Sequence, residues 1–365
     1  MNNRMRALSV ALLTSCILFI AACSGNNEEV ADVIATNTMS PTMEPTPTVT
    51  PEPTSTPMPY IAPLTGIGLE QEATNRPLAV MINNYSAARP QSGLTQADVI
   101  WEILAEGGIT RLEAIFQSTT EQTKTLGPIR SNRAYLIDIA DSYGAIMAHA
   151  GGSPEAYGIL QKQGKPYLDE ISNAGGYFWR SKDRKAPHNL YSELERLRKA
   201  ADNKGYNNKL PAAAAYPFSP EGALTGATAS SAEDAKKIEI TFLGQDYEVE
   251  YQYDEATGLY KRFINNEPHI DRNTDEALTA TNLVVFETKH TVYDNVGRLT
   301  IDLKTGGAAY IFEKGKKISA QWVRAKDGMI RFMKDGQEVP FVPGTTFIHV
   351  VPNSPALAEH VTISM

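Results

Sequence analysis

Cysteine is scarce in this sequence, and its scarcity excludes several kinds of chemistry. The 365 residues contain two cysteines, Cys16 and Cys23, and both lie at the N-terminal end. If the first 22 residues are removed as a secretion signal and Cys23 is modified, the mature chain keeps no free thiol and forms no disulfide. Thiol catalysis and cysteine-based zinc sites are thereby excluded. Burial of apolar side chains alone must hold the fold together.

Long hydrophobic runs are also missing. The longest apolar stretch, Ala7–Ile20, is shorter than the roughly 20 residues that a membrane-spanning helix needs. Two arginines precede this stretch, and Ala21, Ala22 and Cys23 close it. A positive start, an apolar run and small residues before a cleavage point predict a signal peptide over residues 1–22.

The residues that close the signal resemble the lipobox of bacterial lipoproteins. This resemblance implies that Cys23 receives a lipid of the palmitate type. It also implies that the protein is anchored on the outer face of the cell membrane. An ordinary signal peptide followed by an unmodified cysteine is the alternative. Residues 23–59 favour the lipobox, because their alternation of proline with threonine and serine predicts a disordered, extended tether.

A surplus of basic residues is absent too. Lysine and arginine number 34 against 42 acidic residues, which gives a formal net charge of −8. A nucleic-acid partner requires a basic face that neutralises phosphates, so we expect none. The histidines are not paired at ligand spacing, and neither a Walker loop nor a dinucleotide fingerprint occurs. We therefore expect no metal and no cofactor.

Residues 60–205 alternate between strand and helix patterns, which predicts an α/β (α+β) domain with a parallel or mixed sheet. Short apolar runs bounded by turn residues predict strands at 77–83, 99–104, 112–117 and 145–148. Apolar residues at helical spacing predict helices at 131–143, 154–163 and 192–203.

The pattern changes beyond residue 205. Residues 206–235 are rich in alanine, proline, glycine and serine, and we interpret them as a connection. Residues 236–365 alternate apolar and polar side chains with a period of two, and turn residues separate most of the segments. This pattern predicts a mainly antiparallel β domain packed on the first one.

The segment Gly127–Arg133 is the first candidate for a binding site. It follows a predicted strand and precedes a predicted helix, which Ser131 or Asn132 can cap. Arg130 and Arg133 would then lie beside a helix N-terminus, an arrangement that suits a phosphate or a carboxylate. The alternative is that these arginines bridge Glu102, Glu106 or Glu113 and only tie the sheet together.

The segment His149–Ser153 repeats the same pattern. A strand ends at His149, Gly151 and Gly152 allow close approach to the backbone, and Ser153 precedes a proline that starts a helix. Ligands gather at such carboxyl ends of strands in open α/β sheets. We predict that Arg111, Arg130, Arg133 and His149 line one concave surface. His149 is the candidate general base, with a purely structural role as the alternative.

An aromatic group, Tyr177–Trp179, stands beside Arg180. Aromatic rings in this setting can stack on a sugar ring or line a groove. Packing in the core or in an interface is the alternative.

Several segments resemble the YerB-like lipoproteins of Gram-positive bacteria, an uncharacterised family. They cover nearly the whole chain after the tether. The matching segments are Arg89–Gly93, Glu106–Arg111, Gly127–Ser131 with Arg133, His149–Ser153, Gly297–Arg298 and Gln321–Arg324. The resemblance implies a two-part globular region outside the membrane. It adds Arg89, Arg298 and Trp322 to Glu102 and Glu106 as secondary candidates.

Two functions remain open. The first is a non-catalytic envelope protein that binds an anionic wall ligand or a membrane-bound protein of wall synthesis. The second is an envelope enzyme, either a transferase of phosphoryl-linked polymers or a wall hydrolase, with Arg130, Arg133 and His149 in its pocket. A distant similarity to the LytR-CpsA-Psr phosphotransferases does not decide between them. Ser131 stands here where those enzymes have a metal-binding aspartate.

Overall fold

The computed structural model describes residues 58–119, 124–207, 215–243 and 247–364. The predicted signal peptide, Cys23 and all but the last two residues of the predicted tether lie outside this range. Among the residues described, no helix combines the length and apolar character that crossing a membrane requires.

The N-terminal region alternates strands with helices, as its sequence pattern predicts. Its strands are β1 (Tyr60–Ile61), β2 (Gly68–Leu69), β3 (Leu78–Asn83), β4 (Val99–Leu104), β5 (Thr110–Phe116), β6 (Thr125–Leu126), β7 (Ile146–His149), β8 (Tyr167–Asp169), β9 (Trp179–Arg180) and β10 (Leu190–Glu193). Its α-helices are α1 (Ala134–Ser142), α2 (Pro154–Lys162) and α3 (Leu194–Asn203).

The C-terminal region consists mainly of strands. They are β11 (Glu233–Asp234), β12 (Lys237–Thr241), β13 (Glu248–Asp254), β14 (Leu259–Ile264), β15 (Glu267–Pro268), β16 (Thr279–Ala280), β17 (Asn282–Thr288), β18 (His290–Val292), β19 (Leu299–Ile301), β20 (Gly307–Glu313), β21 (Lys316–Arg324), β22 (Ile330–Lys334), β23 (Gln337–Glu338), β24 (Thr346–Pro352) and β25 (Val361–Ser364). Two short helices accompany them, α4 (Gly226–Ser231) and α5 (Leu357–His360).

A single 12-stranded sheet runs through both regions. Its order is β23-β22-β21-β20-β17-β24-β4-β5-β3-β7-β8, with β11 added beside β21. The strands from β23 to β17 are antiparallel, whereas β3, β7 and β8 are parallel. The predicted mixed sheet and the predicted mainly antiparallel C-terminal region are therefore confirmed. The two regions are joined where β24 pairs in parallel with β4.

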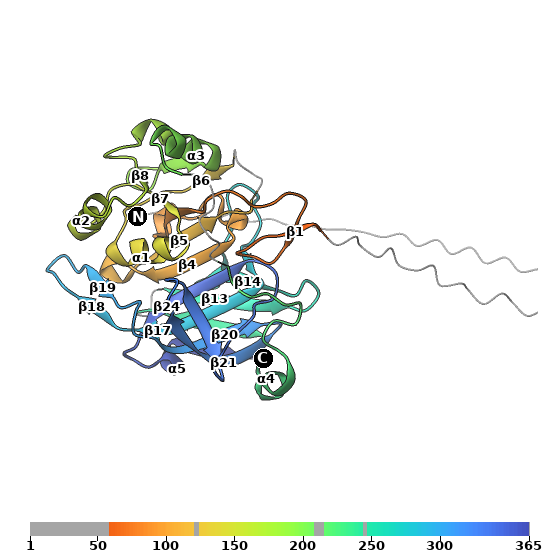
Figure 1. Ribbon diagram of the computed structural model, residues 1–365. Helices are drawn as coiled ribbons and strands as arrows, with labels where there is room; N and C mark the ends of the chain where they lie inside the picture. The colour runs from red at the N-terminus through yellow and green to blue at the C-terminus, as the bar shows by residue number, and fades with distance from the viewer. Residues whose placement is uncertain (1–57, 120–123, 208–214, 244–246, 365) are drawn as a thin grey trace, which may run out of the picture. The chain divides into compact units, whose positions relative to one another are not determined.

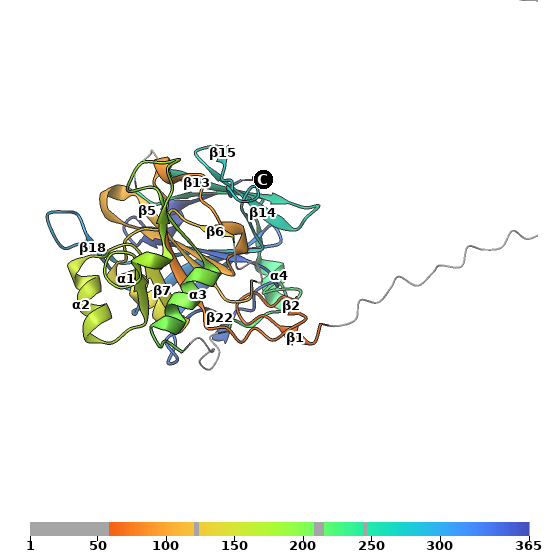
Figure 2. The same ribbon diagram turned by 90° about the horizontal axis from the view of Figure 1, so that it is seen from above.

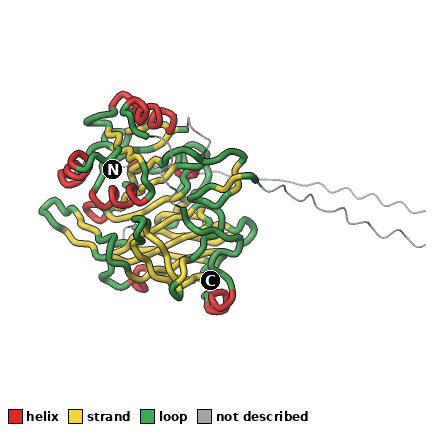
Figure 3. The backbone as a smooth tube through the Cα atoms, viewed as in Figure 1, coloured by secondary structure: helices red, strands yellow, loops and turns green. Residues whose placement is uncertain are grey.

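Two hydrophobic clusters lie against this sheet. Helices α1 and α2 contribute Ile137 and Leu160 to one cluster. Helix α3 contributes Leu197 to the other, together with Ile240 and Tyr251 from a second, six-stranded sheet built from β12 to β16 and β25. The helices gather round the N-terminal region, while strands fill the C-terminal region (Figure 1, Figure 3).

The hairpin of β18 and β19 projects from the body. Figures 1 and 2 place it at the opposite end of the molecule from β1 and β2, where the described chain begins. It exposes Val292, Tyr293 and Val296, whose exposed fractions are 61%, 43% and 65%.

Candidate functional site

The two candidate turns meet at the carboxyl ends of parallel strands. Strands β3, β7 and β8 end together, and the segment after Gly127 runs beside the end of β3, where the Arg130 N–H donates to the Met81 carbonyl. The Ala150 N–H donates to the Arg130 carbonyl at 3.0 Å, and the Asn132 N–H donates to the Gly151 carbonyl at 2.9 Å. The backbone thus holds both turns side by side.

A cavity of about 540 Å³ opens between these turns, and we call it the arginine cavity. It contains two arginines, two hydroxyl groups and glycine backbone beside apolar side chains. Its lining residues are Ile129, Arg130, Ser131, Ala150, Gly151, Gly152, Tyr157, Ile171, Arg180, Pro187 and Leu190. Among the residues that the structure describes, no acidic side chain lines it. The cavity therefore presents positive charge to whatever enters it.

Gly151 allows the two turns to approach closely. Its φ is 74°, in the left-handed region that favours glycine. A Cβ atom there would lie 3.1 Å from Ile171 Cδ1 and 3.6 Å from Ser131 Oγ. A side chain at this position would occupy the space between the walls of the cavity.

Arg130 is half-buried at the wall of the cavity. Its Nε is buried and has no hydrogen-bond partner among the described residues. Burial lowers the pKa of Arg130, and the positive charge of Arg133 lowers it further. Arg180, the second arginine of the cavity, is more exposed. It contacts the Glu170 carboxylate at 3.2 Å and donates to Asn189 Oδ1 at 3.1 Å.

Arg111 lies beside these groups but is only 2% exposed, and it does not line the arginine cavity as the sequence predicted. It stands on β5 opposite Asn83, the last residue of β3. Its Nε and Nη1 have no hydrogen-bond partner in the described part of the chain. Burial lowers the pKa of Arg111 to about 10, and the charges of Arg133 and Arg130 act in the same direction. Buried guanidinium nitrogens without hydrogen-bond partners are costly, so a nearby anion would stabilise Arg111.

Arg133 has a different role from the one its position in the sequence predicts. It forms a two-pronged ion pair with Glu106, in which Nη2 donates to Oε2 at 2.8 Å. It does not line the arginine cavity. The structural alternative therefore holds for Arg133. One carboxylate still faces three arginines, because Arg111 and Arg130 interact with the same Glu106.

Neither Ser131 nor Asn132 caps helix α1. The helix starts at Ala134, and Arg133 occupies the capping position without a side-chain bond. The Ser131 hydroxyl instead donates to the Ala150 carbonyl at 2.9 Å, which ties the two turns together. Ser153 caps helix α2, since its Oγ accepts from the Ala156 N–H at 3.1 Å. Ser153 is buried and lies outside the lining of the cavity.

His149 is fully buried and does not line the arginine cavity. Its Nδ1 lies 2.9 Å from the Gly151 carbonyl oxygen and 3.6 Å from Asp169 Oδ1. The imidazole also stacks on Tyr167. Burial lowers the pKa of His149, although Asp169 acts in the opposite direction. The neutral imidazole supports the glycine turn from behind.

Asp169 is a site residue that the sequence analysis missed. Its Oδ1 accepts from the Gly151 N–H at 2.7 Å, and its Oδ2 accepts from the Tyr157 hydroxyl at 2.8 Å. It therefore fixes one glycine and one hydroxyl of the cavity. Its position in the sequence could have indicated this role, because Asp169 directly follows the apolar pair Tyr167–Leu168 and ends a short strand.

The pKa of His188 is affected by the positive charges around the cavity. Its Nδ1 lies 2.8 Å from Asn83 Nδ2. Burial lowers the pKa of His188, and the charges of Arg130 and Arg184 lower it further. The positive charge of Arg130 therefore disfavours protonation of His188.

Glu102, a secondary candidate, belongs to a separate buried network. It accepts from Arg262 Nη2 at 2.6 Å and from the Thr110 hydroxyl at 2.7 Å. Tyr247 donates to the same carboxylate, and Arg89 lies over the Tyr247 ring. This network connects the large sheet to the six-stranded sheet. Its hydrogen bonds use the Glu102 carboxylate, which is therefore not available to a ligand.

The two remaining secondary candidates are held by local contacts. Trp322 is fully buried, and its Nε1 donates to the Glu287 carbonyl at 2.9 Å. Arg298 pairs with Asp294 at 2.8 Å in the β18–β19 hairpin. Neither residue lines the arginine cavity.

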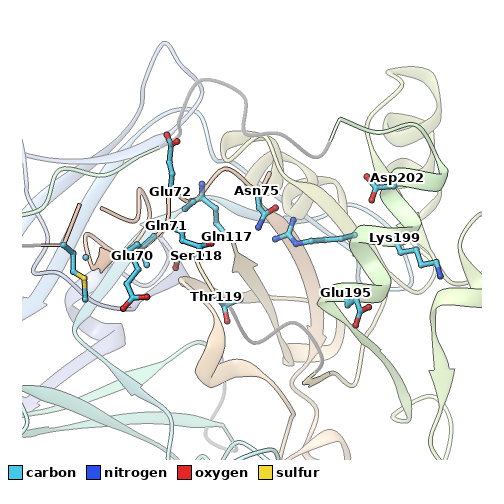
Figure 4. A pocket seen from close by; sticks show the side chains of 15 residues that line it. Glu70, Gln71, Glu72, Asn75, Gln117, Ser118, Thr119, Glu195, Lys199 and Asp202 are labelled. Carbon is cyan, nitrogen blue, oxygen red and sulfur yellow. The ribbon is translucent and has the colours of Figure 1, made fainter. Parts of the chain in front are cut away.

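A larger cavity than the arginine cavity lies elsewhere, with a volume of about 830 Å³ (Figure 4). Acidic, basic and amide side chains from the N-terminal segment, the end of β5 and helix α3 line it. They include Glu70, Glu72, Gln117, Glu195 and Lys199. The mixture of charges gives this cavity no single electrostatic preference, in contrast to the arginine cavity.

One acidic cluster within the described residues has the spacing of a metal site. Glu239, Glu248 and Glu250 lie together on β12 and β13. Lys237 occupies two of them, with Nζ at 2.7 Å from Glu239 and 3.1 Å from Glu250. A lysine among these carboxylates already supplies the positive charge that a cation would bring.

Comparison with known proteins identifies relatives along most of the chain. Residues 64–207 match the family model described as the N-terminal domain of a protein of unknown function, DUF3048, and residues 238–348 match its C-terminal domain. The chain is 37% identical over 293 residues to "Putative lipoprotein YerB" of Bacillus subtilis, covering 80% of this chain and 86% of that protein. The crystal structure of YerB protein from Bacillus subtilis superimposes with a TM-score of 0.75 at 35% identity, covering 84% of this chain and all of that one.

Proposed function

This chain belongs to the DUF3048 family, and we propose that it is a lipid-anchored envelope protein that binds an anionic ligand in the arginine cavity. The observation that carries this proposal is the excess of buried positive charge. Among the described residues, Arg111 and Arg130 both have buried guanidinium nitrogens without hydrogen-bond partners, and Glu106, whose charge acts on both, is already paired with Arg133. A phosphate or carboxylate in the cavity would supply an acceptor for Arg130, and its negative charge would also stabilise the buried charge of Arg111.

The cavity also has the size and rigidity of a small-molecule site. A volume of about 540 Å³ lies within the range that ligand pockets occupy. Asp169 fixes Gly151 and Tyr157, and backbone bonds hold the Arg130 turn in place. A preorganised wall reduces the conformational entropy that binding would otherwise cost.

Binding suits this cavity better than catalysis does. In the described part of the chain, neither an imidazole nor a carboxylate lines it, and the His149 imidazole is turned to the Gly151 carbonyl behind the wall. General acid–base catalysis needs such a group within hydrogen-bond reach of the reacting atom. The groups present bind and orient an anion.

The anchor in this proposal is a lipid on Cys23. The lipobox-like residues before Cys23 and the similarity to a protein named as a lipoprotein support it. Replacing Cys23 with alanine should release the protein from the membrane fraction, because no apolar run as long as Ala7–Ile20 occurs again in the sequence. Unchanged membrane retention, or labelled lipid still attached to the variant, would argue against this anchor.

Calorimetric titration of the full chain with inorganic phosphate and pyrophosphate tests the binding site. We expect Arg130→Gln to weaken binding about tenfold or more, because a charge-assisted hydrogen bond is lost. Lys236→Gln is the matched control, since it removes one exposed positive charge that pairs with Glu255. Equal affinities for the wild type and Arg130→Gln would refute the proposed site.

A membrane-bound protein partner is the second candidate, and the β18–β19 hairpin is the observation that favours it. Its exposed Val292 and Val296 form an apolar tip near helix α2, where the Tyr293 hydroxyl interacts with Ser153. Val296→Asp should weaken such an association without affecting phosphate binding. Site-specific cross-linking from position 296 in intact cells would identify the partner, and the absence of any cross-linked protein would count against it.

A further inference from the structure

Strands β9 and β10 form a ribbon between two cavities. In this ribbon Arg180 pairs with Leu190, and Trp179 pairs with Tyr191. Arg180 and Leu190 line the arginine cavity, whereas Trp179 and Tyr191 line another cavity of about 250 Å³. Successive side chains of a strand point to opposite faces, so the ribbon presents charge to one cavity and aromatic rings to the other.

We call this second space the Trp179 cavity. Beyond the two aromatic rings, its wall consists of hydroxyl, amide, carboxylate and guanidinium groups. Its lining residues are Ser92, Thr125, Trp179, Ser181, Asp183, Tyr191, Arg272 and Asn273.

Trp179 is the accessible tryptophan of the protein. Trp101 and Trp322 are fully buried, whereas Trp179 is partly exposed. Its ring stacks on Tyr191 with centroids 6.3 Å apart, and the Arg196 guanidinium lies 5.1 Å from the ring centre. These contacts fix the ring in one orientation at the cavity wall.

Tyr191 contributes an unsatisfied polar group to the same wall. Its side chain is 3% exposed, and its hydroxyl has no hydrogen-bond partner among the described residues. Buried hydroxyl groups are normally paired, so this one lacks an acceptor or donor that a ligand could provide.

Hydrogen bonds and an ion pair connect the polar groups of the wall. Asn273 Nδ2 donates to the Thr125 carbonyl at 2.9 Å, and Arg272 pairs with Asp183 at 3.1 Å. Asp271 accepts from the Asn273 N–H and from the Gly93 N–H, which ties this loop to the N-terminal region. The Asn273 amide is therefore held in place at the cavity wall, whereas Arg272 and Asp183 form an exposed ion pair beside it.

We infer that the Trp179 cavity binds a pyranose unit of the ligand whose anionic group lies in the arginine cavity. A pyranose ring offers an apolar face of C–H groups for Trp179 and hydroxyl groups for Asp183 and Asn273. This inference rests on the proposed function and narrows its ligand to an anionic glycan. The ligand would cross the ribbon of β9 and β10, with its sugar in the Trp179 cavity and its anionic group in the arginine cavity.

Acrylamide quenching of tryptophan fluorescence tests this inference on the full chain. Because Trp101 and Trp322 are buried, Trp179 dominates the quenchable signal. The neutral probes are maltotetraose and tetra-N-acetylchitotetraose, and inorganic phosphate is the anionic probe. We expect at least one tetrasaccharide to protect Trp179 and phosphate to leave the quenching unchanged. A phosphorylated tetrasaccharide should bind about tenfold more tightly than its neutral form, because it also engages the arginines.

Two variants separate the two cavities. Trp179→Ala should weaken tetrasaccharide binding, followed by calorimetry, by about fivefold and leave phosphate affinity unchanged. Trp179→Phe should restore part of that affinity. Tyr60→Ala, which removes an exposed aromatic ring at β1, is the matched control.

The outcomes distinguish this inference from the proposed function. If phosphate binds but neither tetrasaccharide protects Trp179, the glycan inference fails and the anion site stands. If a tetrasaccharide binds but phosphate and the phosphorylated form gain nothing from Arg130, both the anion site and the combined ligand are refuted. If Trp179→Ala weakens phosphate and sugar equally, the residue is structural and the inference is overturned.

Discussion

Two buried arginines in this protein differ in a way that separates structure from function. Arg262 is fully buried, and its nitrogens reach Glu102, Tyr251 and His269. Arg111 is nearly as buried, yet its Nε and Nη1 have no partner among the described residues. Burial acts to lower both pKa values. Glu102 and two tyrosines reverse the effect at Arg262, whose pKa rises above its usual value, whereas the pKa of Arg111 falls to about 10.

The difference shows what a fold demands of a buried charge. A guanidinium with a complete set of partners holds two sheets together and has no capacity left for a ligand. A guanidinium without them destabilises the empty protein, and the cost is recovered when an anion binds. The comparison therefore indicates a stabilising role for the Glu102–Arg262 network, and it is consistent with the proposed binding role of Arg111 and Arg130.

The largest effect should follow from breaking the satisfied pair. Arg262→Ala leaves Glu102 buried and uncompensated, and we expect the free energy of unfolding to fall by about 3–5 kcal/mol. Urea denaturation measures this change. The double variant Glu102→Gln with Arg262→Met should recover much of the loss, because it leaves no isolated charge. A loss below about 1 kcal/mol in the single variant would contradict the assignment.

Glu313 extends the comparison to a buried acid with incomplete partners. Its Oε2 accepts from the Ala223 N–H at 2.9 Å, while its Oε1 has no partner among the described residues. Burial raises the pKa of Glu313 to about 7. A raised folded-state pKa favours the protonated form, so its contribution to stability is complete below the unfolded pKa and is lost as the pH rises through 7.

Glu313→Gln should therefore flatten the pH dependence of unfolding between about pH 4.5 and 8, a range over which the wild type loses about 3 kcal/mol through this group. Thermal or urea unfolding across that range measures the effect. Glu221→Gln, which changes an exposed carboxylate paired with Lys314, is the control. An unchanged slope in Glu313→Gln would show that another group dominates.

Changing Arg111 should separate binding from stability. Arg111→Met removes a buried charge whose Nε and Nη1 have no hydrogen-bond partner among the described residues, and it keeps a long side chain. We therefore expect the free energy of unfolding to stay constant or rise. Phosphate affinity should fall about tenfold in calorimetric titration, because the nearby positive charge is lost. A destabilisation as large as that of Arg262→Ala, with affinity unchanged, would place Arg111 among the structural residues.

The sequence predicted the parts of this fold that depend on local pattern. Helices α1 and α2 and strands β3 and β4 appear where the spacing of apolar residues indicates them. The juxtaposition of the Gly127 and His149 turns was predicted too, but for a wrong reason. The strand before Gly127, β6, pairs antiparallel with β10 in a separate three-stranded sheet, and the Arg130 backbone reaches the large sheet through the Met81 carbonyl.

Pairings between distant segments were beyond the sequence pattern. Strand β24 pairs with β4 across some 250 residues of chain, and Arg262 meets Glu102 across 160. Periodicity reports which side chains are buried but not which strand lies next to them. The capping of α1 was mispredicted for a related reason, because the Ser131 hydroxyl found the Ala150 carbonyl of the neighbouring turn.

The smallest expected effects concern Ser153 and Ser131, which the sequence placed in one site and the structure separates. Ser153→Ala removes the cap of helix α2 and should lower the free energy of unfolding by about 1 kcal/mol. Phosphate affinity should not change, since Ser153 lies outside the lining of the arginine cavity. Thermal unfolding and calorimetry on the same samples measure both quantities.

Ser131→Ala is the complementary change, because Ser131 lines the arginine cavity. Its hydroxyl already donates to the Ala150 carbonyl, so it can only accept from a protonated ligand or help to hold the turn. We therefore expect phosphate affinity to fall by about two- to threefold, less than for Arg130→Gln. If Ser153→Ala weakened phosphate binding more than Ser131→Ala did, the start of helix α2 would belong to the binding site. Residues outside the lining of the cavity would then also have to be counted as binding residues.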